Sequence, residues 1–367
     1  MPPVEVAAAR FPKTSRATAP TDATAGNSAT PDGNLFADLL SAQLFTLPTD
    51  GSHIAVAEDD ERPEVLAGLT VISGRDLYIS GQKRRVYYSG DTRVDPFYRR
   101  RGIASSLFME QKKYRTDQEL LQGIVLKDNT APLEAAANAA DGVLFRFWVS
   151  HTIETSFIYV RKQQPRVPQG VTLRQATRAD APRMQAYFDR EAPRRNGYPV
   201  YDFGKLLAGD PYYTGLRIEH YVLAERNGEI VGMLAGWDQK AYKQTRIVGF
   251  KPIVKVLRPL YNLYVGLAGG FKLPAVGGAL NYLTVYNTLV TDDDTAVHRA
   301  LLDWLMAHQG QKYDAIATAF THGDPLVETP RGYKRQKLFS SNFWLSYGDD
   351  PRPGIDSRPL YVELGRL

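Results

Sequence analysis

The feature that most constrains this chain is the stretch from Val94 to Leu107, whose pattern predicts a strand, a tight turn and a helix. A β-prone run at residues 85–88 leads into it, and apolar residues at helical spacing follow the turn. The turn carries three consecutive arginines and then Gly102. A helix start presents unpaired backbone N–H groups and favours an anion, and a glycine lets a ligand approach the backbone closely. The stretch therefore suits a pyrophosphate.

The residues just after the glycine are small, which keeps this approach clear. Ala104 and Ser105 occupy these positions, and the Ser105 hydroxyl could donate one more hydrogen bond. An ordinary strand–turn–helix with its arginines in solvent is the alternative interpretation, so the local pattern alone leaves both open.

The same residues resemble a known motif. Arg99-x-x-Gly102-x-Ala104 is similar to the acyl-coenzyme A loop (R/Q-x-x-G-x-G/A) of the GNAT acetyltransferase superfamily, and Val94-x-Pro96-x-Tyr98 resembles the strand end before that loop. The resemblance implies an α/β (α+β) fold, a mixed and mostly antiparallel twisted sheet flanked by helices, with acetyl-coenzyme A as co-substrate. It covers most of the chain beyond residue 50 but is specific only around residues 94–107.

The resemblance also implies a set of site residues. The backbone around Arg93 and Val94 is expected to hydrogen-bond the thioester carbonyl. Asp91 is the candidate base for the incoming amine, and Glu58 is a more distant one; a turn carboxylate is the alternative role for Asp91. The implied contacts of the cofactor are Arg93, Val94, Arg99, Arg100, Arg101, Gly102, Ile103, Ala104, Ser105 and Asn129.

The general acid departs from the family pattern. In the family a tyrosine often lies seven residues after an asparagine that follows the fifth strand. Asn129 looks like that asparagine, but the position seven later is Ala136. Another group or solvent must then protonate the leaving thiolate, or catalysis is impaired. Tyr98 and Tyr114 are interpreted as packing residues, and Asn129 could instead cap a helix.

Two segments with the same pattern indicate a tandem arrangement. Residues 53–71 and 220–235 each read as a β-hairpin, and Asn227-Gly228 is a strong hairpin turn. Residues 171–180 resemble the opening strand and first helix start of a GNAT domain, with Thr177 or Asp180 as the cap. The predicted division is a flexible leader at 1–33, a domain with an intact loop at 34–163, a linker at 164–170, a degenerate domain at 171–348 and a C-terminal tail at 349–367.

Further elements follow from periodicity and from turn residues. The first domain is expected to close with strands at 144–150 and 155–160. The second is expected to contain a strand at 280–289, a helix at 295–309, a strand at 313–319 and closing strands near 336–347. The tail could add an edge strand at 360–364.

The second domain lacks the phosphate-binding chemistry of the first. Where the loop should fall, the chain places three aspartates, Asp292 to Asp294, and no glycine. Carboxylates there repel a pyrophosphate, so this copy is predicted not to bind coenzyme A. Asp294 or Thr295 as a helix N-cap explains the segment; a metal site is a weaker alternative, because no ligand spacing is present.

Composition narrows the function classes. The chain has 367 residues, a net charge of +5 and no cysteine, which excludes disulfides, thiolate metal sites and cysteine nucleophiles. The mild positive charge fits a polyanionic co-substrate. No nucleic-acid-binding motif occurs, the six histidines lack ligand spacing, and neither a hydrolase elbow, a P-loop nor a zinc-protease motif is present. We therefore expect no metal and no nucleic-acid partner, and without a signal peptide or a long apolar run a cytoplasmic location.

The expected activity is transfer of an acetyl group from acetyl-coenzyme A to a primary amine of a small molecule or peptide, by direct attack in a ternary complex. One alternative is a non-catalytic acyl-coenzyme A sensor. Another is a lipid-directed acyltransferase that uses the basic, apolar segment 247–280 at a membrane surface; a long insertion that covers a core or lines a pocket is the simpler interpretation of that segment. Neither the acceptor, the acyl-chain preference nor the oligomeric state follows from the sequence.

Overall fold

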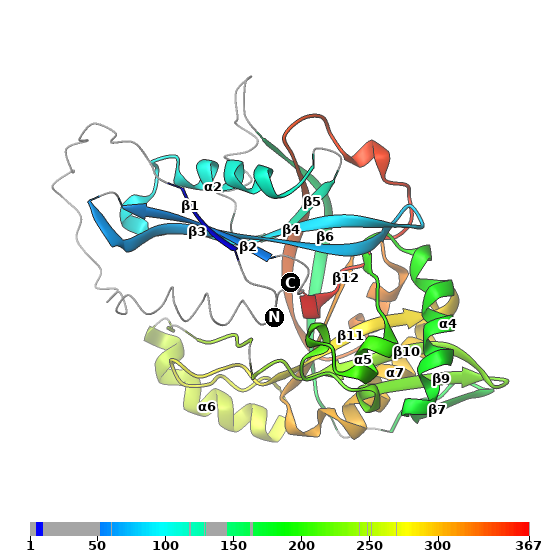
Figure 1. Ribbon diagram of the computed structural model, residues 1–367. Helices are drawn as coiled ribbons and strands as arrows, with labels where there is room; N and C mark the ends of the chain where they lie inside the picture. The colour runs from blue at the N-terminus through cyan, green and yellow to red at the C-terminus, as the bar shows by residue number, and fades with distance from the viewer. Residues whose placement is uncertain are drawn as a thin grey trace. The chain divides into compact units, whose positions relative to one another are not determined.

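The computed structural model describes residues 5–9, 52–59, 61–116, 119–127, 129, 145–161, 164–241, 243–247, 249–250, 252–268 and 270–366. The chain divides into two compact units (Figure 1). The first is built from the chain up to Gly74 and from Tyr87–Glu119, and the second from Arg75–Val86 and Leu120–Leu367. Of the predicted flexible leader, only Glu5–Ala9 are described, and they form strand β1. The rest of the leader and Ala136 lie outside the described residues.

In its described residues, the first unit is a sheet with one helix and two short 3-10 turns. Its strands are β1 (Glu5–Ala9), β2 (Ser52–Asp59), β3 (Arg62–Ile79) and β4 (Gln82–Val94), and the other elements are η1 (Pro96–Tyr98), α2 (Ile103–Gln111) and η2 (Lys112–Tyr114). β1 pairs with β2 in parallel, and β2 pairs with β3 in antiparallel. The predicted hairpin over residues 53–71 is confirmed. The far ends of β3 and β4, residues 75–86, belong to the second unit.

The side chains of β2 and β3 give this sheet two apolar faces. One face packs against α2 through Ala55, Ala57 and Ala67, which meet the buried Ile103 and Leu107 of the helix. The other face buries a cluster made of Ile54, Val56, Leu69 and Val71. Alternation along β2 places Ala55 and Ala57 on the helix face. On β3 a β-bulge opposite Ala57 and Glu58 interrupts the alternation, and Ala67 therefore joins the helix face although Leu69 and Val71 lie on the other.

Among the described residues of the second unit, the main run of strands has the order β5-β13-β6-β12-β11-β10-β9-β7. Their bounds are β5 (Leu120–Leu126), β6 (Arg146–Tyr159), β7 (Val171–Gln175), β9 (Tyr221–Arg226), β10 (Glu229–Trp237), β11 (Tyr282–Val290), β12 (Ala315–Thr321) and β13 (Arg335–Ser346). β11 and β12 are parallel and the other neighbours are antiparallel. The two-residue strand β8 (Tyr198–Pro199) pairs with Leu77 and Tyr78 of β3. The sheet is therefore mixed and mostly antiparallel, as predicted.

The helices described beside these strands are α4 (Ala181–Glu191), α5 (Phe203–Ala208), α6 (Pro252–Ala268), α7 (Thr295–His308) and α8 (Glu328–Arg331). Short 3-10 turns are η3 (Arg178–Asp180), η4 (Ala192–Arg194), η5 (Pro211–Tyr213), η6 (Ile218–His220), η7 (Thr291–Asp293), η8 (Gly310–Lys312), η9 (Pro325–Val327), η10 (Arg352–Gly354) and η11 (Leu364–Arg366). α7 packs on β9 and β10 through Val297, Leu301 and Leu305 (Figure 1). In the part of the chain that the structure describes, no helix is long and apolar enough to cross a membrane.

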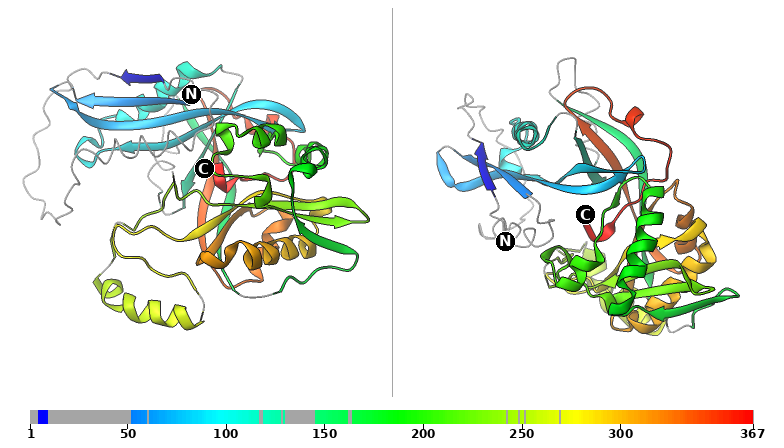
Figure 2. Two further views of the ribbon diagram at one scale, coloured as in Figure 1. Left: turned by 60° about the horizontal axis from the view of Figure 1, so that its bottom comes forward. Right: turned by 45° about the vertical axis from the view of Figure 1, so that its right-hand side comes forward.

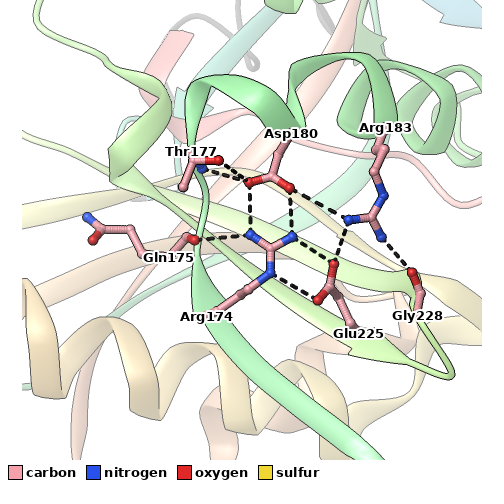
Figure 3. A network of polar contacts seen from close by, with 7 residues as sticks. All are labelled: Arg174, Gln175, Thr177, Asp180, Arg183, Glu225 and Gly228. Carbon is pink, nitrogen blue, oxygen red and sulfur yellow. Dashed lines mark hydrogen bonds and ion pairs between the residues drawn. The ribbon is translucent and has the colours of Figure 1, made fainter.

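A polar network fixes the start of the α4 region (Figure 3). Thr177 and Asp180 form a reciprocal capping box, which confirms the predicted cap. The Arg174 guanidinium donates to both Asp180 and Glu225, at 2.6 and 2.8 Å, and Arg183 lies 3.0 Å from Glu225. The hydrogen bonds from Arg174 lower the pKa of both carboxyl groups, so the network stays ionised at neutral pH.

The structure differs from two of the sequence predictions. The closing strands predicted at 144–150 and 155–160 are one continuous strand, β6, whose neighbours are β12 and β13. The boundaries between the two compact units do not fall at the predicted linker, because strands from distant parts of the sequence share one sheet. The domain boundaries drawn from internal similarity stay predictions.

The tail also differs from expectation. Leu360 makes a single β-bridge to Asn196, and residues 361–363 form no strand. They are buried instead: Glu363 accepts hydrogen bonds from the hydroxyls of Tyr201 and Tyr361 at 3.0 and 2.9 Å. Burial raises the pKa of this carboxyl. The apolar residues of this segment are buried among other side chains and pair with no strand. The alternation of apolar residues was therefore not sufficient to predict an edge strand.

Candidate active site

The predicted loop begins where β4 ends. The Asp95 N–H donates to the Ala67 carbonyl of β3 at 2.9 Å, and the Asp95 carboxylate accepts from the Phe97 N–H at 2.8 Å. These two bonds tie the loop to the sheet and cap η1. Pro96 at the first position of η1 has no N–H to satisfy, which suits a helix start.

Tyr98 anchors the loop through its buried ring and its hydroxyl group. Its ring is buried, and its hydroxyl donates to the Asp59 carboxylate and accepts from Arg62 at 2.6 Å. The hydrogen bond from Tyr98 lowers the pKa of Asp59 to about 2, while burial raises the pKa of Tyr98. Tyr98 is therefore a neutral packing and anchoring residue, in line with its interpretation from the sequence.

Gly102 is the N-cap of α2 and adopts a left-handed conformation, with φ of 78°. A Cβ built on it meets no atom within 4 Å, so the space in front of the helix start is open. No side chain caps this helix, and Ser106 is the first residue whose N–H bonds to the Gly102 carbonyl, at 3.0 Å. The first turn of α2 thus presents backbone N–H groups toward open space, the arrangement that binds anions at helix starts.

Gly68 sets the position of this helix, and sequence reasoning missed it. A Cβ on Gly68 would lie 2.8 Å from the Arg93 carbonyl oxygen, 3.1 Å from Ile103 and 3.3 Å from Leu107. The absence of a side chain lets β3, the end of β4 and the start of α2 meet closely. A glycine within an alternating strand pattern is the signal that could have identified this close approach.

The three arginines of the loop are exposed. The Arg99 Nε lies 3.4 Å from the Val94 carbonyl oxygen, and Arg101 lies over the rings of Phe97 and Tyr98, with 5.2 Å to each centroid. Arg93 forms an ion pair with Asp91, at 3.6 Å between nitrogen and oxygen. The loop therefore places several cations around the open helix start, where they attract a polyanion.

The structure brings most of the predicted site residues together. Asp91 and the nine candidate cofactor contacts from Arg93 to Ser105 form one continuous stretch of the first unit, and Asp91 has a left-handed backbone, with φ of 52°. Ile103 is buried, so only its backbone can reach a ligand. Asn129 belongs to the second unit, where it is exposed and its N–H donates to the Leu126 carbonyl at 2.9 Å.

A second strand–turn–helix, β11–η7–α7, stands where the degenerate loop was predicted. The Asp294 carboxylate caps α7 by accepting from the N–H groups of Ala296 and Val297, at 2.9 and 3.2 Å. The predicted cap is confirmed. All three aspartates of this turn form ion pairs: Asp292 with Arg194, Asp293 with Arg195, and Asp294 with Arg226. Among the described residues no group of three metal-ligating side chains occurs.

Comparison with known proteins rests on the fold. No protein-family model matches the sequence, and no curated protein matches it. A glucosamine N-acetyltransferase region of a fungal multi-domain β-N-acetylglucosaminidase matches with a TM-score of 0.53 and 11% identity, over 83% of this chain and 34% of that one. The chain has the fold of the GCN5-related N-acetyltransferases.

Two further solved structures of N-acetyltransferase fold are similar to this chain, each with a TM-score below 0.5. A GCN5-related N-acetyltransferase from Sphaerobacter thermophilus matches with a TM-score of 0.47 and 14% identity, over 82% of this chain and 80% of that one. A tandem GNAT protein from the clavulanic acid biosynthesis pathway matches with a TM-score of 0.49 and 13% identity, over 85% and 88%. The predicted fold class of a mixed, mostly antiparallel sheet flanked by helices is confirmed by the strand topology and by the match at a TM-score of 0.53, while the tandem division stays a prediction. The activity depends on the site itself.

Proposed function

We propose that this chain is an acyltransferase that moves an acetyl group from acetyl-coenzyme A to a primary amine. The observation that carries the proposal is the open, uncapped start of α2 at Gly102, surrounded by exposed arginines. This arrangement lies on a fold shared with N-acetyltransferases.

The residues of the loop fit a pyrophosphate. The N–H groups of Ile103, Ala104 and Ser105 would bind its oxygens, and the Ser105 hydroxyl could add a donor. Arg99, Arg100 and Arg101 would neutralise its charge. The open space at the Cβ position of Gly102 is a cradle that any side chain would fill.

The co-substrate supplies an activated acyl group and a thiolate leaving group. The chain must then orient the thioester carbonyl, for which the backbone near Arg93 and Val94 is the predicted donor, and accept a proton from the amine. We assign the proton acceptor to Asp91, whose carboxylate is partly exposed and paired with Arg93. With alanine at position 136, the thiolate takes its proton from another group or from solvent.

The test is release of coenzyme A thiol with acetyl-coenzyme A and a panel of primary amines. Because the chain contains no cysteine, a thiol reagent reports the product alone. We expect turnover by the wild type and none by Gly102→Glu. Gly209→Glu is the matched control: Gly209 is also exposed and left-handed, with φ of 75° and open space at its Cβ, so the backbone strain of about 1–2 kcal/mol is the same.

Asp91→Asn tests the base. We expect a fall in kcat of about 100-fold or more with little change in KM, and a partial recovery at high pH where the amine is already deprotonated. An unchanged kcat would remove Asp91 from the mechanism.

One observation favours a second candidate, a non-catalytic acyl-coenzyme A sensor: the residue at the position of the family tyrosine is Ala136. Binding that depends on Gly102 without thiol release for any amine would support the sensor. Turnover would rule it out.

A further inference from the structure

The helix α6 presents an apolar face to solvent. Seven large apolar side chains on it are 49–85% exposed: Ile253, Val256, Leu257, Leu260, Leu263, Tyr264 and Leu267. They recur at spacings of three and four residues, so they form one stripe along a helix of 17 residues. A stripe of this kind normally faces a core, and contiguous exposed apolar surface marks an interaction site.

Contacts of the helix and of the residues that follow it hold α6 in place. Val265 and Phe271 are buried, and the Phe271 ring packs edge-on against Phe157 of β6, at 5.9 Å between centroids. The Asn262 side chain donates to the Leu273 carbonyl and accepts from the Leu273 N–H, both at 2.9 Å. The outward direction of the apolar stripe is therefore fixed by contacts.

Backbone hydrogen bonds also join the two ends of the segment that contains α6, residues 246–247 and 277–279. The Ile247 N–H donates to the Gly278 carbonyl at 3.1 Å, and the Gly277 N–H donates to the Ile247 carbonyl at 2.7 Å. Arg246 forms a β-bridge with Ala279 and donates to the Gly277 carbonyl. Figure 2 shows α6 at the end of the two extended segments that these bonds join.

The charge of the segment has one sign. From residue 239 to residue 290 the chain has seven lysines and arginines and no aspartate or glutamate. Lys255 and Arg258 lie on the helix itself, and the Lys334 ammonium lies 5.9 Å from the centroid of the Tyr264 ring. The occupant of this face therefore meets an apolar stripe on a helix whose own charged residues, Lys255 and Arg258, are both cationic.

The composition of the stripe distinguishes a lipid surface from a protein. The centres of protein interfaces are enriched in aromatic residues and arginine, which fill pockets on the partner. This stripe is aliphatic except for Tyr264, and a bilayer requires no shape complementarity. A basic amphipathic helix lying in the plane of the headgroups buries such a face, while its cations attract anionic lipids.

We propose that α6 binds the surface of membranes containing anionic phospholipid, with its apolar stripe inserted among the acyl chains near the headgroups. The helix lies on the bilayer and does not cross it. The proposal is independent of the acyltransferase proposal, because it involves neither Gly102 nor the arginines of the loop.

The test is flotation of the full chain with vesicles of phosphatidylcholine and phosphatidylglycerol, and with vesicles of phosphatidylcholine alone. We expect flotation with the anionic vesicles, weakened by high salt. The triple variant Val256→Gln, Leu260→Gln and Leu267→Gln should reduce the partition coefficient at least tenfold, because it replaces three of the seven apolar side chains of the stripe, including the two most exposed. Thiol release and the urea midpoint of unfolding should match the wild type.

The matched control removes three exposed apolar side chains elsewhere, with Val149→Gln, Val167→Gln and Leu338→Gln. It should float as the wild type does. No flotation of the wild type, or equal flotation of the two triple variants, would overturn the proposal. A wild type that is dimeric by light scattering, fails to float and becomes monomeric in the α6 variant would show instead that this face binds a second copy.

Discussion

The two strand–turn–helix segments of this chain differ in what lies at the helix start. In the first, the N-cap of α2 is Gly102, which offers no side chain and faces open space. In the second, the N-cap of α7 is Asp294, whose carboxylate already binds two backbone N–H groups. The same local architecture thus leaves the helix start available to a ligand in one case and satisfies it internally in the other.

The charges around the two turns follow the same division. Three exposed arginines, Arg99 to Arg101, surround the first. Three aspartates occupy the second, each paired with an arginine. An anion is attracted to the first turn and repelled from the second. Two features therefore distinguish a binding loop from a structural one: the residue at the N-cap, and the sign of the charges around it.

Transplanting the cap should produce the largest effect. Gly102→Asp gives α2 the residue that caps α7, so its carboxylate would compete with the pyrophosphate for the same N–H groups. We expect the Kd for acetyl-coenzyme A to rise roughly 100-fold in a calorimetric titration. Gly209→Asp, with the same backbone strain, should bind as the wild type does. Unchanged affinity in a folded Gly102→Asp protein would contradict the comparison.

Removing the charge of the first turn should have the next largest effect. The triple substitution of Arg99, Arg100 and Arg101 by alanine should weaken binding roughly 30-fold at low salt, and it should flatten the salt dependence of the Kd. The matched control replaces Arg146, Arg166 and Arg178, which are exposed and change the net charge equally. An equal loss in the control would assign the effect to the charge of the whole molecule.

The second helix carries a buried histidine where the first has Ser106. His298 is fully buried, and neither ring nitrogen has a hydrogen-bond partner in the described parts of the chain. Burial, with Arg195 and Arg299 nearby, lowers its pKa to about 3. Below pH 6.5, the ordinary pKa of histidine, the unfolded chain therefore binds a proton that the folded chain does not. The free energy of unfolding decreases as the pH is lowered.

From pH 6.5 to pH 5 we expect the free energy of unfolding to fall by about 1.5 kcal/mol through this group. In His298→Leu, the decrease in the free energy of unfolding over the same pH range should be smaller by this amount, as measured by urea unfolding at both pH values. Identical pH slopes for the two proteins would show that the histidine accepts a proton in the folded state.

Removing the cap of the second helix should have the smallest effect. Asp294→Ala should lower the free energy of unfolding by about 1 kcal/mol, as measured in urea, and should not create a site for acetyl-coenzyme A. Asp292→Ala is the control, because that carboxylate is exposed and does not cap the helix. A new binding site in Asp294→Ala would mean that the cap alone separates the two turns.

Local sequence signals predicted much of this molecule. The strand before Val94, the turn at Gly102 and the helix after it were predictable because glycine, proline and apolar spacing act over a few residues. The capping box at Thr177 and the cap at Asp294 follow from the same short-range chemistry. The stretch that holds most of the candidate site is continuous in sequence, which is why its residues could be named.

What depended on distant contacts could not be predicted. The position of β6 between β12 and β13, and the burial of Glu363, come from residues far apart in the chain. The Asp59–Tyr98 bond and the close approach at Gly68 likewise require knowing which strands are neighbours. The segment 247–280 was predicted as basic and apolar, but only the structure shows which side of α6 faces solvent.

The most direct test of the account is calorimetric titration of acetyl-coenzyme A into the wild type, Gly102→Glu and Gly209→Glu. We expect one site per chain in the wild type, the same site in Gly209→Glu and no binding in a folded Gly102→Glu. Two sites per chain, or an undiminished site in Gly102→Glu, would contradict it.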